Sequence, residues 1–166
     1  MKIFFDTEFI DDGKLVTLMS IGMVREDGAR LYLENKDCDL ASAPEWHQQN
    51  TIPLLQKTPD VVLPHAEIAQ RVKDFCGKDP EFWAYYASYD WICLCQLYGR
   101  MLDVPEGWPM GVNDLRWLRT LAGNPPLKKP AISHNALADA EWVREMWILL
   151  RTVCQGGVIL PTPIEP

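Results

Sequence analysis

The sequence lacks the cysteine spacings of disulfide-rich and zinc-binding proteins. Its five cysteines are an odd number and form no Cys-x-x-Cys pair. This argues against a disulfide scaffold or a zinc ribbon and favours a reducing compartment. No apolar run approaches the ~18 residues of a membrane span, and Asp6 interrupts the apolar start, unlike a signal peptide. We therefore expect a cytoplasmic protein without a membrane segment.

Basic residues are also few, since 16 Lys and Arg against 23 Asp and Glu give a net charge of −7. A non-specific duplex binder needs many cations for phosphates, so that class is disfavoured. An enzyme that holds a short strand end remains allowed, because bound metal ions supply positive charge locally. A length of 166 residues with 48% apolar residues suits one domain with a full core. We expect that domain over residues 1–155, followed by a C-terminal tail at 156–166.

The stretch from Lys2 to Phe9 organises the rest of the chain. Ile3 to Phe5 are apolar and β-favouring, which predicts a strand buried on both faces near the centre of a sheet. Side chains two residues apart in a strand point to the same face, so Asp6 and Glu8 should project side by side. Two anions held close in a dry place repel strongly unless a cation sits between them, and hard divalent cations take oxygen ligands.

The remaining pattern predicts an α/β fold. Further strands are expected at 15–24, 29–33, 82–87 and 112–115, and helices at 46–51, 64–77, 90–101, 115–122 and 134–153. The first three strands are joined by short turns and should form an antiparallel meander. Later strands alternate with helices, so we expect parallel strands beside the first one, in a mixed sheet with helices on both faces.

Two later carboxylates lie where site residues often occur. Asp90 falls where the 82–87 strand gives way to a helix, although a helix cap would also explain it. Asp139 lies near the start of the last helix among small alanines, where the helix dipole would also favour an acid. His134 precedes Asp139 by five residues, a spacing of ~140° in a regular helix. The two side chains can converge only if His134 belongs to the entry loop or a frayed first turn.

Together these residues form an ordered pattern. The sequence has Asp-x-Glu on a first strand (DTEF), Asp after a later strand (YASYDW) and His-x4-Asp opening a late helix (HNALADAEW). This resembles the DEDD superfamily of 3′–5′ exonucleases, which has the ribonuclease H-like fold. A histidine five residues before the last aspartate matches the DEDDh type. Within that type the motifs are most similar to small stand-alone bacterial and phage exoribonucleases, often described as polyadenylate-specific.

The resemblance implies a catalytic set and its metals. It implies phosphodiester hydrolysis with two divalent ions, Mg²⁺ or Mn²⁺, held by Asp6, Glu8, Asp90 and Asp139, with Asp6 bridging both. His134 would act as general base. The implied product is a 5′-mononucleotide released from the 3′ end of single-stranded RNA. A DNA exonuclease of proofreading or repair type with the same residues is the alternative, and a catalytically silent nucleic-acid-binding module is the second.

The sequence gives weaker signals for the residues that contact the substrate than for the catalytic set. Thr7, Phe9, Met19 and Tyr89 are the candidates to contact the strand end, with base stacking by the apolar and aromatic ones; core packing is the other interpretation for Phe9 and Met19. Lys128 and Lys129 would reach a phosphate or simply form a solvated loop. The resemblance also suggests a homodimer, for which an exposed Trp46 or Trp108 would suit the interface.

Overall fold

A six-stranded mixed sheet forms the centre of the fold. The computed structural model describes residues 1–128, 130 and 132–155, apart from the side chains of 153–155. Within these residues the strand order is β4-β3-β2-β1-β5-β6. Strands β1 to β3 are antiparallel, whereas β4, β5 and β6 pair in parallel with β3, β1 and β5. The strands are β1 (Lys2–Asp11), β2 (Val16–Arg25), β3 (Arg30–Asn35), β4 (Val62–Leu63), β5 (Glu81–Ala84) and β6 (Asn113–Asp114). The predicted mixed sheet, with the first strand inside it, is confirmed.

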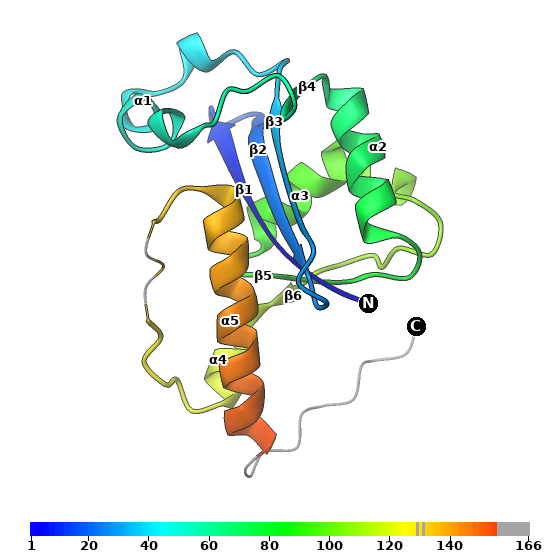
Figure 1. Cartoon of the computed structure of the whole chain (residues 1–166), viewed down its shortest axis with the longest axis vertical. Coiled ribbons are helices and arrows are strands. Elements are labelled where there is room, and N and C mark those ends of the chain that lie inside the picture. The colour runs from blue at the N-terminus through cyan, green and yellow to red at the C-terminus, as the bar shows by residue number, and fades with distance from the viewer. Residues whose placement is uncertain (129, 131, 156–166) are drawn as a thin grey trace.

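Alternation along β1 divides the core between the two faces of the sheet. Ile3 and Phe5 are fully buried in a cluster with residues of α2 (His65–Cys76) and α3 (Ser88–Gln96). Phe4 points the other way and packs with residues of α4 (Leu115–Leu121) and α5 (Ala136–Gln155). Figure 1 shows α5 on one side of the strands and α2 on the other. Helices therefore cover both faces, and Asp6 and Glu8 continue the series that points toward α5.

The start of α5 lies directly on the sheet at Gly22. This residue of β2 is paired with Asp6 of β1. A Cβ atom at Gly22 would lie 2.2 Å from the carbonyl carbon of Ala136 and 2.3 Å from the backbone nitrogen of Leu137. Only glycine permits so close an approach between a strand and the backbone of a helix. Gly22 thereby brings the first turn of α5 beside Asp6.

The segment between β3 and α2 folds over one end of the sheet. It contains α1 (Glu45–Asn50), which confirms the helix expected at 46–51, and two short 3₁₀ turns at Leu40–Ser42 and Ile52–Leu54. A small apolar cluster beneath it contains Met19 with Cys38, Ala43, Ile52 and Leu55. Another 3₁₀ turn spans Met101–Asp103. None of the helices in the described residues is long and apolar enough to cross a bilayer.

The largest differences from the sequence expectations are at β5, α3 and α5. The strand expected at 82–87 ends at Ala84, and α3 runs over Ser88–Gln96 rather than 90–101. The last helix begins at Ala136, so His134 lies outside it. The two-residue strand β4 was not predicted, because two residues show no alternation. The tail expected at 156–166 lies outside the described part of the chain, and α5 runs to Gln155, two residues beyond the expected helix end at 153.

Candidate active site

Strand β1 presents Asp6 and Glu8 from the same face. They lie opposite Gly22 and Ser20 of β2, and the register of the two strands then shifts between Glu8 and Phe9. The parallel pairing of β1 with β5 covers only Lys2 to Phe4. The carboxylates therefore stand where β1 has left its parallel neighbour, at the edge where sites form in open α/β sheets.

The first turn of α5 supplies the third carboxylate. The Asn135 side chain accepts a hydrogen bond from the Ala138 N–H at 3.0 Å, which caps the helix. The backbone N–H of His134 donates to Asp139 Oδ2 at 2.8 Å. His134 has φ +66°, in the left-handed region, so the chain turns back on itself just before the helix. Because His134 precedes the helix, it lies beside Asp139 despite the five-residue spacing.

Asp6, Glu8 and Asp139 form one cluster, in which each residue offers an oxygen and these oxygens all lie within 4.8 Å of one another. Burial, followed by the charges of Asp90, Glu8 and Asp139, raises the pKa of Asp6 well above its usual range. Burial, then the charges of Asp139 and Asp90, raises the pKa of Glu8 to about 8. Burial also raises the pKa of Asp139. An oxygen-only donor set with such mutual repulsion fits a hard divalent cation.

Asp90, whose charge helps to raise the pKa of Asp6 and Glu8, is almost fully buried, with 5% of its surface exposed. Its Oδ1 accepts hydrogen bonds from the Thr7 N–H at 2.8 Å and the Thr7 hydroxyl at 2.7 Å. It is the third residue of α3 and not the helix cap, which is Ala87. Burial raises the pKa of Asp90 to about 6, although the two bonds from Thr7 oppose the rise. Asp90 thus connects α3 to β1 through Thr7, which lies between Asp6 and Glu8 on that strand.

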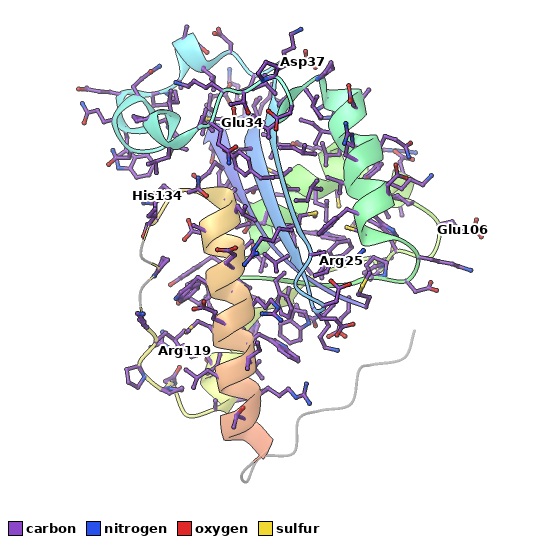
Figure 2. The ribbon with its side chains drawn as sticks, viewed as in Figure 1. Arg25, Glu34, Asp37, Glu106, Arg119 and His134 are labelled. Carbon is purple, nitrogen blue, oxygen red and sulfur yellow. The ribbon has the colours of Figure 1, made fainter. Side chains whose placement is uncertain are left out.

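A cavity of about 680 Å³ contains all five residues of the DEDDh pattern. Its lining comes from β1, α1, the β5–α3 connection, α3, α4, the loop before α5, and α5 itself. Figure 2 shows His134 near the first turn of α5, and Arg119, a residue of α4, lower in the view alongside α5. The other lining residues are Thr7, Phe9, Trp46, His47, Tyr85, Tyr86, Tyr89, Leu127, Lys128, Pro130, Ser133, Trp142 and Val143.

Aromatic side chains form much of the cavity wall. Phe9 and Tyr89 stack with ring centres 5.1 Å apart and planes 12° apart. The His134 ring meets Trp46 edge-on at 4.8 Å. Trp142 packs edge-on against Tyr85 at 5.0 Å. Flat apolar surfaces beside the carboxylates suit the faces of nucleobases.

The structure brings some predicted substrate residues to the cavity and leaves others out. Phe9, Tyr89 and Thr7 line it, although the Thr7 hydroxyl is already bonded to Asp90. Met19 does not line it: only 1% of its surface is exposed, and it packs among apolar residues beneath α1. The predicted base contact by Met19 is therefore wrong. The register shift leaves Met19 without a partner on β1, which the sequence pattern did not indicate.

The two tryptophans suggested for an interface, and the two lysines of the loop before α5, differ from each other in the structure. Trp108 is 7% exposed, packs against Phe82 and donates its indole N–H to the Gly77 carbonyl, so it is not an interface residue in this fold. Trp46 is 49% exposed but stands at the cavity, against His134. Lys128 lines the cavity, whereas Lys129 lies outside the described residues.

Several residues that line the cavity were not predicted from the sequence. Trp142 lies three residues after Asp139 and therefore on the same helical face, a spacing that would have indicated it. His47 belongs to none of the three motifs, yet it lines the cavity. Arg119 and Tyr86 belong to no motif and reach the cavity only through the fold.

Comparisons with known proteins agree with this geometry. The family model of the 3′–5′ exoribonuclease Rv2179c-like domain matches residues 1–150. The chain belongs to this family. Two curated proteins of Mycobacterium tuberculosis, the 3′–5′ exoribonucleases Rv2179c (strain ATCC 25618 / H37Rv) and MT2234.1 (strain CDC 1551 / Oshkosh), are similar to it. Each is 35% identical over 146 residues, which are 84% of this chain and 87% of the relative.

Solved structures support the fold of this Rv2179c-like domain. A 3′-exonuclease described in the recognition of a histone mRNA stem-loop has a TM-score of 0.53 at 13% identity, over 99% of this chain and 71% of that one. A full-length 3′-exonuclease has a TM-score of 0.52 at 12% identity, over 99% of this chain and 92% of that one. At such low identity they show the fold alone, which is the ribonuclease H-like fold expected from the sequence.

Proposed function

We propose that this chain is a metal-dependent 3′–5′ exoribonuclease that releases 5′-mononucleotides from the 3′ ends of single-stranded RNA. One observation carries the proposal: Asp6 and Glu8 of β1 meet Asp139 of α5 within 4.8 Å inside a cavity. The matching family and the two relatives named as 3′–5′ exoribonucleases support the reaction and the RNA substrate.

The carboxylates supply the site for divalent metal. Asp6, Glu8 and Asp139 would hold one Mg²⁺ or Mn²⁺ ion, and Asp90 would take part in holding a second. Bound there, the ions would stabilise the negative charge on the attacking and leaving oxygens of the phosphodiester. Burial and then the charges of Asp139 and Asp90 raise the pKa of Glu8 to about 8, and this supports the role, because a bound cation would offset both effects.

His134 would be the general base. Its backbone is held by Asp139, and its ring lies at the cavity against Trp46. Imidazole is the side chain that exchanges a proton near neutral pH, so it can take a proton from an attacking water. The left-handed backbone of His134 aims the ring from the loop rather than from the helix.

The aromatic wall would hold the strand end. The Phe9 and Tyr89 rings lie next to the carboxylates and offer a surface for the terminal bases. Thr7 would act by holding Asp90 in place. The motif resemblance suggests a preference for adenylate 3′ ends.

The experiment follows 5′-labelled oligomers over time with Mg²⁺ and with chelator. A descending ladder from the 3′ end is expected with Mg²⁺ and none with chelator or with Asp6→Asn. Efficient cutting of a circular single strand would contradict an exonuclease. Bound but intact RNA in Mg²⁺ would indicate the silent binding module.

Matched oligomers decide the substrate. RNA and DNA of the same sequence should differ in rate in favour of RNA, and faster cutting of DNA would support the proofreading or repair alternative. RNA oligomers that end in adenylate or uridylate test the 3′-end preference. Equal rates for both ends would remove the adenylate preference and leave the exonuclease proposal intact.

A further inference from the structure

The cavity that holds the carboxylates also has two cations in its lining, Arg119 of α4 and Lys128 of the loop before α5. We infer that Arg119, assisted by Lys128, binds the backbone phosphate of the RNA next upstream of the phosphate that is cleaved. This inference rests on the proposed function and adds a second phosphate site to the same cavity.

Arg119 is held in place by the backbone. Its Nε donates to the Pro125 carbonyl at 3.0 Å, and the residue is half-buried. Leu118 beside it is buried in the cluster between α4 and α5. The guanidinium is thus fixed at the cavity wall before any ligand arrives, which lowers the entropy cost of binding.

Lys128 is tied to the helix that carries Asp139. The Trp142 indole N–H donates to the Lys128 carbonyl. Trp142 follows Asp139 by three residues, about one turn along α5. Lys128 and Arg119 therefore lie farther along α5 than the carboxylates do. Figure 2 shows Arg119 in that direction from His134.

Arg119 differs from most arginines of this acidic chain. Arg25, Arg30, Arg71, Arg100 and Arg116 each form an ion pair with a carboxylate. Within the described residues, no carboxylate pairs with Arg119 or Lys128. The nearby Arg116 is already engaged by Asp114 and stacks over the Tyr86 ring at 4.2 Å. In a chain of net charge −7, such cations inside a cavity point to an anionic ligand.

Phosphate is the anion that this cavity would receive. A guanidinium offers paired N–H donors that match phosphate oxygens. The cleaved phosphate would be neutralised by metal at the carboxylates, whereas the next one has no metal and needs a protein cation. Cations at one end and carboxylates at the other would also favour one direction of the strand in the cavity.

The test compares Arg119→Gln and Lys128→Gln with Arg71→Gln, which removes one positive charge from α2. Glutamine at 119 keeps an N–H donor. The substrates are an RNA oligomer and thymidine 5′-monophosphate p-nitrophenyl ester, a small diester with a single phosphate. Arg119→Gln should raise KM for RNA ~10-fold relative to its effect on the small ester. The slope of log KM against log salt should fall by ~0.7 for each phosphate contact removed. Arg119→Lys should restore the slope but only part of the affinity.

Two results would overturn the inference. In the first, Arg119→Gln slows cleavage of the small ester as much as cleavage of RNA, which would place Arg119 at the catalytic end. In the second, Arg119→Gln raises KM for RNA no more than Arg71→Gln does. Binding of fluorescent RNA in Ca²⁺ separates failure of this site from failure of the proposed function. A wild-type protein that cuts nothing but binds RNA in an Arg119-dependent way would refute the exonuclease and keep the phosphate site. Absence of RNA binding would refute the site.

Discussion

The bond from the His134 N–H to Asp139 Oδ2 links the two residues of the third motif. It uses the backbone of His134, so the ring stays available to the cavity. It also explains the five-residue spacing, since His134 must lie outside the helix, in a left-handed conformation, to turn back to Asp139. A residue other than glycine pays for this conformation with strain, which is typical of functional sites.

His134→Ala should lose turnover while keeping metal binding. Alanine retains the N–H that holds Asp139, but it removes the general base, whose loss typically costs about 10²–10⁴-fold in rate. The measurement is the rate of 3′-end release together with the Mg²⁺-induced rise in melting temperature. His65→Ala, on α2, is the matched control. Wild-type rates in His134→Ala would assign the base to another group.

Asp139→Asn should melt higher than wild type in chelator. Neutralising one carboxylate relieves the repulsion with Asp6 and Glu8, and the amide oxygen still accepts from His134. The variant should gain less from Mg²⁺ and be inactive. Thermal melting at pH 8 with chelator and with Mg²⁺ tests this. A lower melting temperature in chelator, with a normal Mg²⁺ response, would make Asp139 a helix-end residue only.

The motif residues were predictable because their order along the chain and the alternation of β1 are visible in the sequence. Asp90 was placed correctly at the strand-to-helix transition, but its bonds to Thr7 depend on where α3 packs. Met19 could not be placed, since the register shift after Glu8 is a property of the strand pair. Arg119 reaches the cavity through the packing of α4, which no local pattern encodes.

At the level of elements, the site depends on the contact between α5 and β2. The backbone of Ala136 and Leu137 occupies the space that a side chain at Gly22 would need. Because these are backbone atoms, no change of side chain on α5 relieves the contact. The α5 position then sets the distance from Asp139 to Asp6, which is paired with Gly22.

Gly22→Ala should destabilise the fold and loosen the metal site. Forcing a methyl group into a packed contact typically costs about 1–3 kcal/mol, and moving α5 away would separate Asp139 from Asp6. Denaturant unfolding and Mn²⁺ affinity are the measurements. Gly111→Ala is the control, because a Cβ there meets nothing within 4 Å. Unchanged stability and Mn²⁺ affinity in Gly22→Ala would show that the close contact does not position the site.

The antiparallel meander and the main helices were predicted because strand alternation and helical spacing are local signals. The end of β5 and the start of α3 were not predicted correctly. The sequence of Tyr85 to Ala87 favours a strand, but these residues leave the sheet, because β5 pairs with β6 only at Trp83 and Ala84. Tyr86 takes φ +59° there, which allows the sharp turn into α3.

For the whole molecule, the buried carboxylate cluster makes stability depend on pH. Burial and neighbouring carboxylates raise the pKa of Glu8 from 4.5 to about 8. Between these values the folded state binds more protons than the unfolded chain, so the free energy of unfolding falls as pH rises through this window. Stability from Glu8 is fully present below about pH 4.5 and is lost above about pH 8.

In chelator, the melting temperature should therefore fall between pH 5 and pH 8, and it should fall less in Glu8→Gln. Mg²⁺ should remove most of the wild-type loss, because it binds the ionised carboxylates of the folded state. The measurement is a set of thermal melts across this range with and without Mg²⁺. A pH dependence equal in wild type and Glu8→Gln would show that Glu8 ionises as it does in water.

The most direct test of the account is a titration of Mn²⁺ by calorimetry on wild type, Asp6→Asn and Glu106→Gln. Asp6 lies in the carboxylate cluster, whereas Glu106 is exposed on a distant loop, as Figure 2 shows. Wild type and Glu106→Gln should bind Mn²⁺ alike, and Asp6→Asn should bind more than about tenfold more weakly and release no nucleotide from RNA. Equal Mn²⁺ binding by Asp6→Asn and wild type would contradict a metal site built by β1 and α5.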